Sequence, residues 1–241
     1  MVRKVFLRAA AAVCVLFAAP ALAETAGEPA SAALLMQAAQ KAKDFAQYRY
    51  AYTLDFWTSD GEKEISAKLR FDPRLQEGER WTLLAPAAED LDKKTRKALK
   101  QMQKNDSGDE PILYDGLHEM IDDAELVSDT QTEAVFLAPV DEEDAPRDAL
   151  EVYITLDKTA GYVSAIELKS KQPFKPAAVA KVNALNQIQR FSAPEEGGPA
   201  LIATSETQVE GEAMFKSFAS TTRQVFSEIE RIEMPAEEND G

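Results

Sequence analysis

Hydrophobic and polar residues follow two different periods along this chain. In residues 31–47 apolar side chains recur three and four positions apart, which predicts an amphipathic helix with Ser31 available as its N-terminal cap. In residues 48–56 and 65–71 they recur at every second position, so that successive side chains point to opposite faces of a strand. Asp60-Gly61 separates these two runs and tolerates the positive φ of a tight turn. The pattern therefore predicts a helix followed by a β-hairpin.

Alternation continues through much of the remaining chain and predicts further strands. These runs cover residues 80–84, 124–128, 133–138, 150–156, 162–170, 180–191, 201–209 and 218–232. Two interruptions have a helical pattern: residues 88–104, which are rich in charge and carry one narrow apolar stripe, and residues 112–121. Strands and helices do not alternate as they do around a parallel sheet. The predicted fold class is α+β, mainly antiparallel, with about eight or nine strands, an N-terminal helix and inserted helices.

The first residues of the chain have the pattern of an export signal. Three basic residues precede an apolar run at residues 9–19, and Ala21-Leu22-Ala23 is a small-residue cleavage site. The apolar run is too short to span a bilayer. Cys14 lies inside this run, whereas a lipoprotein would carry its cysteine just after it. We expect cleavage after Ala23 (signal peptide 1–23) and delivery to a bacterial periplasm.

Behind this signal we expect a single domain, residues 24–234, with a helical insertion at residues 88–123 and a disordered acidic tail at residues 235–241. Because Cys14 leaves with the signal, the stability of the mature chain has to come from a hydrophobic core. The formal net charge of -15 disfavours nucleic acid and anionic bilayers as partners. It is typical of a soluble exported protein, with a cationic partner or ion as the alternative. No later apolar stretch is long enough to span a membrane.

No group of residues has the spacing of a catalytic or metal site. The single histidine, His118, is accompanied by neither a Gly-x-Ser-x-Gly elbow nor a cysteine nucleophile, and one such ligand is too few for zinc. Calcium is the best metal candidate, but acidic clusters such as residues 141–144 lack the alternating spacing of a calcium loop. Trp57 and Trp81 are expected in the core rather than stacked on a sugar. We therefore expect a non-enzymatic protein without a cofactor, and an exported hydrolase is the remaining enzymatic alternative.

One stretch of the chain is similar to a known family. Residues 48–86 contain a tyrosine-rich strand, a hairpin, Pro73, the strand Arg80-Trp81-Thr82-Leu83-Leu84 and then Pro86. With this order of elements behind an export signal and an amphipathic helix, the chain resembles the LolA-like half-barrel superfamily, whose members include the periplasmic carrier of outer-membrane lipoproteins. Residues 209–218 look like the closing strands of uncharacterised exported relatives.

The resemblance implies a strongly curved antiparallel sheet wrapped round a helix, with an apolar concavity that takes up acyl chains in that family. Two features depart from the carrier pattern. One is the insertion at residues 88–123, and the other is the negative net charge of the chain, which shows no basic patch in the sequence. The fold and the class of ligand are therefore carried over, and no individual functional residue is.

The sequence thus predicts a periplasmic half-barrel that binds a hydrophobic ligand, a lipid or a lipidated chain, as a carrier or a sensor. Alternation places the members of each strand on one face, which would line the concavity. The expected lining residues are Tyr50, Tyr52, Leu54, Phe56, Ile65, Leu69, Phe71, Trp81 and Leu83. The sequence leaves open whether this face is a cavity or packed core. The alternative is an interaction or scaffold module with a fully packed sheet, which would meet an envelope protein through the charged residues 88–110.

Overall fold

The computed structural model describes residues 28–93, 95–97, 100, 112–140, 149–177, 179–195, 197–214 and 216–233. Three of the segments discussed above lie outside the described residues: the expected export signal at residues 1–23, the acidic tail at residues 235–241 and the acidic loop at residues 141–148. Residues 101–111 of the charged insertion also lie outside them.

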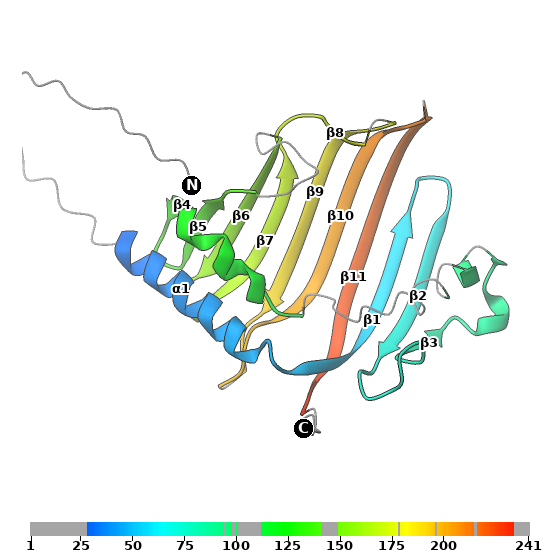
Figure 1. Ribbon diagram of the computed structural model, residues 1–241, viewed down its shortest axis with the longest axis horizontal. Coiled ribbons are helices and arrows are strands. Elements are labelled where there is room, and N and C mark those ends of the chain that lie inside the picture. Colours follow the sequence, from blue (N-terminus) through cyan, green and yellow to red (C-terminus); the bar gives the residue numbers. More distant parts are fainter. Residues whose placement is uncertain are drawn as a thin grey trace, which may run out of the picture.

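An antiparallel sheet of 11 strands forms the main body of the described chain (Figure 1). Its order is β3-β2-β1-β11-β10-β9-β7-β6-β5-β4, and β8 pairs with β9. The strands are β1 (Arg49–Ser59), β2 (Glu64–Phe71), β3 (Trp81–Ala85), β4 (Glu125–Asp129), β5 (Glu133–Ala138), β6 (Leu150–Asp157), β7 (Tyr162–Ser170), β8 (Phe174–Ala177), β9 (Ala180–Ser192), β10 (Leu201–Ala213) and β11 (Lys216–Ile232). The sheet is open, since β3 and β4 stand at opposite ends of this order. The predicted α+β, mainly antiparallel fold class is confirmed.

The described sheet has 11 strands, more than the eight or nine predicted; the ten alternating runs named from the sequence all form strands, and the eleventh is β8. β8 is only four residues long, too short to show a clear alternation of apolar and polar residues. It also contains Pro176, which donates no backbone hydrogen bond and is uncommon in strands. β10 and β11 also run four and two residues beyond their predicted limits at the hairpin that joins them, as β10 ends at Ala213 and β11 begins at Lys216.

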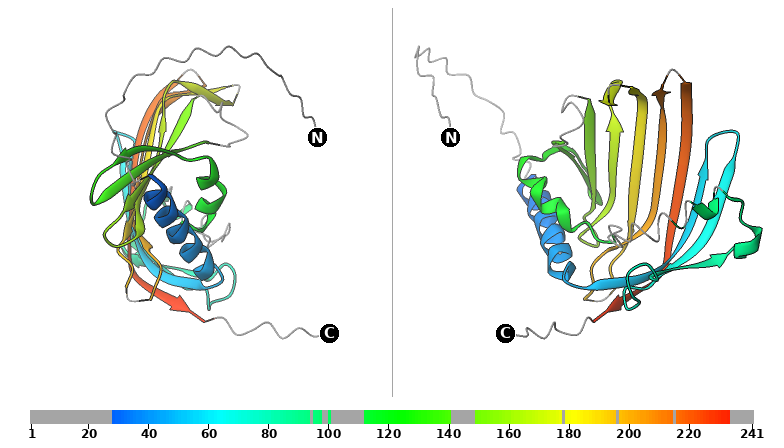
Figure 2. Two further views of the ribbon diagram at one scale, coloured as in Figure 1. Left: turned by 90° about the vertical axis from the view of Figure 1, so that its left-hand side faces the viewer. Right: turned by 45° about the vertical axis from the view of Figure 1, so that its right-hand side comes forward.

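The helix α1 (Glu28–Phe45) lies inside the curve of the sheet, over the end formed by β4 to β7 (Figure 2). Its buried face consists largely of alanine, with Ala38, Ala39 and Ala42 almost fully covered, so the helix can approach its neighbours closely. Ser31 lies within α1 and does not cap it. Its hydroxyl donates a hydrogen bond to Asp129 of β4, with 3.2 Å between Oγ and Oδ2. The residue suggested as a cap is therefore a buried link between helix and sheet.

The two predicted inserted helices differ from expectation. Residues 112–121 form no continuous helix; two 3₁₀ turns lie there and just beyond, η2 (Asp115–Glu119) and η3 (Ile121–Asp123). Leu117 of η2 is fully buried, and η2 packs against α1. The charged segment begins with another 3₁₀ turn, η1 (Ala88–Asp90), and its described residues 93, 95–97 and 100 are helical. Among the described residues, no helix combines the length and the apolar character needed to cross a membrane.

Candidate ligand-binding faces of the sheet

Strand register places most of the predicted lining residues on one face of the sheet. Tyr52 lies opposite Phe71, which in turn lies opposite Trp81 on β3. In the next row Leu54, Leu69 and Leu83 follow one another across the same three strands. Further along β1, Phe56 lies opposite Ala67 and Thr58 opposite Ile65. These side chains share the concave face with α1, since all of them except Thr58 and Ile65 belong to the hydrophobic cluster that contains the helix residues, and the alternation of β1 and β2 places those two on the same face.

Close packing occupies the part of this face nearest β3. The rings of Tyr52, Phe71 and Trp81 contact one another with centroids 5.0 to 5.7 Å apart, and Phe226 of β11 contacts Tyr52 at 5.6 Å. Tyr52 is 0% exposed and Trp81 6%. Leu54 and Leu69 are buried beside them, whereas Phe56, Ile65 and Leu83 are half-buried. The predicted lining thus divides into a packed aromatic cluster and a partly covered margin.

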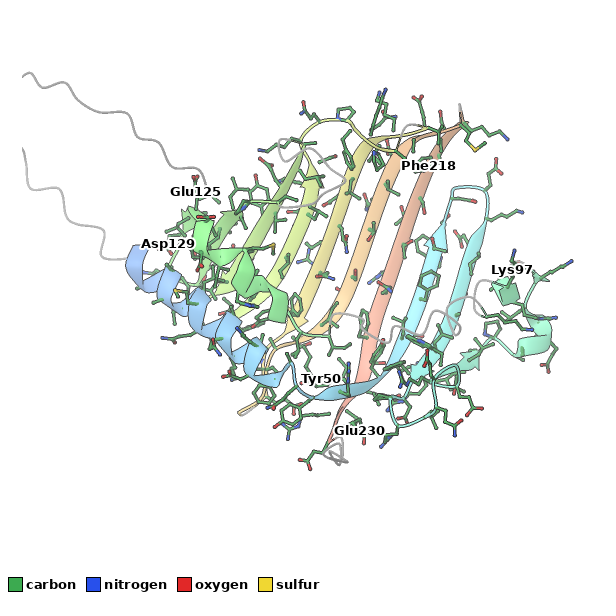
Figure 3. All side chains as sticks on the ribbon, viewed as in Figure 1. Tyr50, Lys97, Glu125, Asp129, Phe218 and Glu230 are labelled. Carbon is green, nitrogen blue, oxygen red and sulfur yellow. The ribbon has the colours of Figure 1, made fainter. Side chains whose placement is uncertain are left out.

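Tyr50 has a different role from the rest of the predicted set. It is buried where β1 leaves α1, and its hydroxyl donates a 3.4 Å hydrogen bond to the carbonyl oxygen of Phe45, the last residue of the helix (Figure 3). The register between β1 and β11 shifts just after it, between Ala51 and Thr53. Tyr50 therefore joins the helix to the first strand.

The described residues of β9, β10 and β11 place no charged side chain on the concave face in the middle of the sheet. Register and burial assign to this face Val182, Leu185, Gln187, Gln189 and Phe191 of β9, Ser205, Thr207, Val209 and Gly211 of β10, and Phe218, Ser220, Thr222, Gln224 and Phe226 of β11. Two neighbouring rows are polar but neutral: Gln224-Ser205-Gln189, and Thr58-Thr222-Thr207-Gln187. In the second row the hydroxyls of Thr58 and Thr222 are 2.9 Å apart. Apolar residues flank both rows.

Burial on this face is greatest beside α1 and η2 and in the aromatic cluster of β1 to β3, and it is lower between them. On β5 and β6, which lie at the helical end of the sheet, Phe136, Ile154 and Leu156 are almost completely buried. Further across, Leu168 of β7, Leu185 of β9 and Phe56 of β1 are half-buried. Phe218, near the tip of the β10–β11 hairpin, is 39% exposed (Figure 3). Among the described residues of the concave face, these apolar side chains between the helical end and the aromatic cluster are therefore only partly covered.

One further polar group is buried at the junction of η2 and the concave face. The hydroxyl of Tyr114 accepts a 3.3 Å hydrogen bond from the backbone N–H of Val163, and its ring meets Phe191 edge-on at 4.9 Å. Burial raises the pKa of Tyr114, so this phenol stays neutral. It adds no charge to the concave face.

The convex face differs in composition, because the alternate positions of β10 and β11 carry charge. They include Glu206, Glu210, Glu212 and Arg223. On the same face, Lys68 of β2 forms a 3.3 Å ion pair with Asp55 of β1. Trp57 also lies here, half-buried and directly opposite Arg223, so the expectation that Trp57 belongs to the core is wrong. Trp81, by contrast, is a core residue.

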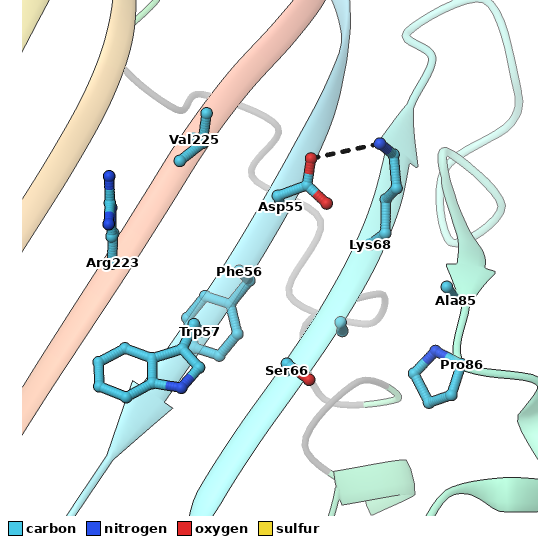
Figure 4. A pocket seen from close by; sticks show the side chains of 10 residues that line it. Asp55, Phe56, Trp57, Ser66, Lys68, Ala85, Pro86, Arg223 and Val225 are labelled. Carbon is cyan, nitrogen blue, oxygen red and sulfur yellow. Dashed lines mark ion pairs between the residues drawn. The ribbon is translucent and has the colours of Figure 1, made fainter.

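Trp57 lines a groove of about 810 Å³ on the convex face (Figure 4). Its walls are Arg223 and Val225 of β11 on one side and Ala85 and Pro86, at the end of β3, on the other. The lining is completed by Asp55, Phe56, Ser66, Ala67 and Lys68. Sequence reasoning missed this groove and the two neutral polar rows. The rows had a readable signal, since charge in residues 204–212 falls on alternate positions only.

Neither catalytic nor metal-binding geometry stands out in the described part of the chain. His118 is half-buried on η2. Within the described residues no group of three or more histidine, cysteine, aspartate or glutamate side chains is placed to hold a metal ion.

Comparison with known proteins gives two solved structures. One is the crystal structure of a LolA superfamily protein from Nitrosomonas europaea, with 11% sequence identity, 85% of this chain and 94% of that chain covered, and a TM-score of 0.36. The other is the crystal structure of MucB in complex with MucA(peri), with 11% identity, 85% of this chain and 100% of that chain covered, and a TM-score of 0.22. A weak LolA-like resemblance is thus found in the structure as well as in the sequence. At these TM-scores it carries no information on the ligand.

No protein-family model and no curated protein matches the chain.

Proposed function

We propose that this chain is a non-enzymatic binding protein of the bacterial periplasm that holds a hydrophobic ligand, a lipid or a lipidated chain, on the concave face of its sheet. One observation carries the proposal. In the middle of the sheet, the described concave positions of β9, β10 and β11 carry no charge and most of them are only partly covered, in a chain of which 29% is charged. Solvent alone would not exclude charge from so many alternate positions, whereas an apolar ligand would, because an unpaired charge under it is strongly unfavourable.

The composition of this face also limits the chemistry of the ligand. Each methylene buried there contributes about 0.8 kcal/mol. A ligand made of hydrocarbon alone would also cover the amides of Gln187, Gln189 and Gln224, and each amide left without a partner would cost about 1–3 kcal/mol. A ligand whose acyl chains are joined to ester or amide groups avoids this loss. Lipids and lipidated polypeptides both have this structure.

The side chains around Tyr52 and Trp81 pack against one another and leave no space for a ligand. We therefore place the ligand on the neighbouring part of the concave face, in the middle of the sheet. The half-buried residues Phe56, Leu168 and Leu185 surround the two polar rows and are the side chains best placed to contact acyl chains. Of the residues expected from sequence, Phe56, Ile65 and Leu83 remain in the proposed lining. Tyr50, Tyr52, Leu54, Leu69, Phe71 and Trp81 would form its supporting wall.

Titration with a dansyl-labelled diacyl phospholipid, whose acyl chains are joined through esters and which has no free carboxylate, tests the proposal. We expect saturable binding by the wild type and at least about tenfold weaker binding after Phe56→Asp or Leu185→Asp, because each puts a charge beneath the acyl chain. The matched control is Val135→Asp, a half-buried apolar residue on the convex side of β5. Thermal unfolding of every variant separates loss of binding from loss of fold.

The rival function, an interaction module with a fully packed sheet, predicts a different result. In that case the wild type binds no probe saturably, and the two concave substitutions lower the melting temperature without any binding to lose. A well-folded wild type without saturable binding would overturn the proposed function. Equal weakening by Val135→Asp would show that the probe does not bind on the concave face.

A further inference from the structure

The groove on the convex face has the composition of a binding site for an amphipathic ligand. Of the ten residues that line it, six are apolar, and Trp57, Val225 and Pro86 offer the largest apolar side chains on its convex side. Register places Phe56 and Ala67 on the other face of the same strands, and Figure 4 shows Phe56 behind β1. Its volume of about 810 Å³ lies within the range of ligand pockets.

Of the three charged side chains that line this groove, two form an ion pair and the third forms none with a described residue. Asp55 and Lys68 neutralise each other across β1 and β2 (Figure 4). Arg223 has no ion pair or hydrogen bond with any described residue. Its cross-strand neighbour on β10, Glu206, instead accepts a 2.9 Å hydrogen bond from the side chain of Gln208. The groove thus offers one guanidinium that forms no ion pair or hydrogen bond with a described residue, in a chain whose net charge is -15.

The dimensions of the groove favour a chain-like ligand. From β11 to β3 it crosses three strand spacings, roughly 14 Å, which is close to the length of an extended chain of about twelve carbons. Arg223 stands at one end of this path and Pro86 at the other, with Trp57 beside Arg223 and directly opposite it in the strand register. A guanidinium donates two parallel hydrogen bonds to a carboxylate, and an indole covers methylenes well.

We propose that this groove binds an acyl chain ending in a carboxylate, with the carboxylate on Arg223 and the chain over Trp57 toward Pro86. The site lies on the opposite face of the sheet from the proposed concave site and does not depend on it. A free fatty acid has both required parts. A neutral alcohol with the same chain lacks the charge and leaves Arg223 without its partner.

The two tryptophans of the chain make the two faces separately measurable, since Trp57 lies in the groove and Trp81 in the concave cluster. A bromine atom quenches only an indole close to it, so the probe is dodecanoate with bromine at carbon 6. In Trp81→Phe protein, where Trp57 is the reporter, we expect saturable quenching by this acid. The difference in quenching between the wild type and Trp57→Phe measures binding at the same site. The Trp57→Phe substitution leaves the core intact.

The matched alcohol and two arginine variants test the role of the carboxylate. We expect 6-bromododecan-1-ol to bind about tenfold more weakly than the acid, and Arg223→Gln to weaken binding of the acid by a similar factor. The control is Arg190→Gln, an exposed arginine that register assigns to the convex face of β9, and it should leave binding unchanged.

Three results would overturn the proposed groove site: no saturable quenching of Trp57, equal affinity for acid and alcohol, or equal weakening by Arg190→Gln and Arg223→Gln. Quenching of Trp81 alone would support the concave site and remove the convex one. Quenching of Trp57 alone, sensitive to Arg223, would do the reverse.

Discussion

Phe218 lies directly opposite Gly211 on the neighbouring strands β11 and β10, with its ring over the glycine. A methyl group at Gly211 would lie 2.8 Å from Cζ of Phe218 and would also collide with the backbone carbonyl oxygen of Lys181 on β9. Gly211 is buried although it lies near the tip of the β10–β11 hairpin. The absence of a side chain there lets three strands and one aromatic ring come together at the margin of the concave face.

Gly211→Ala should therefore destabilise the protein. The ring of Phe218 can move aside, but the carbonyl of Lys181 is held in the sheet, so we expect a loss of about 1–3 kcal/mol in the free energy of unfolding. Urea unfolding measures the loss. The matched control is Gly116→Ala on η2, where nothing lies within 4 Å of the added methyl group. Equal effects of the two substitutions would mean that the crowding at Gly211 is relieved without strain.

Truncation of two residues on the same face of β1 should have unequal effects. Tyr52 is fully buried among three other rings, so Tyr52→Ala should cost about 3–5 kcal/mol in the free energy of unfolding. Phe56 is only half-buried, and Phe56→Ala should cost about 1 kcal/mol. Chemical denaturation of both variants checks this difference. If Phe56→Ala were as destabilising as Tyr52→Ala, the margin that we assign to the ligand would be packed core.

Local interactions explain why the first hairpin was predictable. The side chain of Asp60 accepts hydrogen bonds from the backbone N–H groups of Glu62 and Lys63, and Gly61 has a φ of +84°. These contacts join neighbours in sequence and hold the alternation of β1 and β2 in register. The sequence therefore predicted both the turn and the residues that share a face.

The convex groove was not predictable in this way, because its walls come from distant parts of the chain. Alternation along β1 does predict that Trp57 and Phe56 point to opposite faces of the sheet. The hydrophobicity of Trp57 and Trp81 nevertheless favoured a core position for both. Only the pairing of β1 with β11 brings Arg223 beside Trp57, and only the pairing of β2 with β3 adds Pro86. Such long-range pairing has no local signal in one sequence.

Removal of an export signal stays a prediction, since residues 1–23 lie outside the described residues. Expression in a bacterium with a periplasm should yield a chain that begins at Glu24, because signal peptidase cuts after a small-x-small motif such as Ala21-Leu22-Ala23. Intact mass spectrometry of the periplasmic fraction measures this. The matched variant Ala23→Asp should block cleavage and leave the longer chain on the membrane. A chain that retains Cys14 with a lipid attached would contradict the signal assignment.

Acid should weaken the link between the first helix and the edge of the sheet. Lys158, at the β6–β7 turn, donates a 2.6 Å hydrogen bond to Asp129, and Ser31 of α1 donates one to the same carboxylate. The hydrogen bond from Lys158 contributes most to holding the pKa of Asp129 below its ordinary value. A carboxyl whose pKa is lower in the folded state stabilises the fold above the pKa of the unfolded chain, about 3.9, and loses this contribution as the pH falls through the folded value.

Asp129→Asn removes the titrating carboxyl group and replaces it with an amide of nearly the same size and shape. We expect the wild type to be more stable than this variant by a constant difference above about pH 5, and the difference to shrink as the pH falls below about 4. Urea unfolding at intervals between those values and about pH 2.5 measures it. Asp122→Asn, an exposed position on η3, controls for the loss of one negative charge. A difference that persists undiminished at the lowest pH would show that the amide substituted at this position disturbs packing, and that ionisation of Asp129 does not hold α1 to β4.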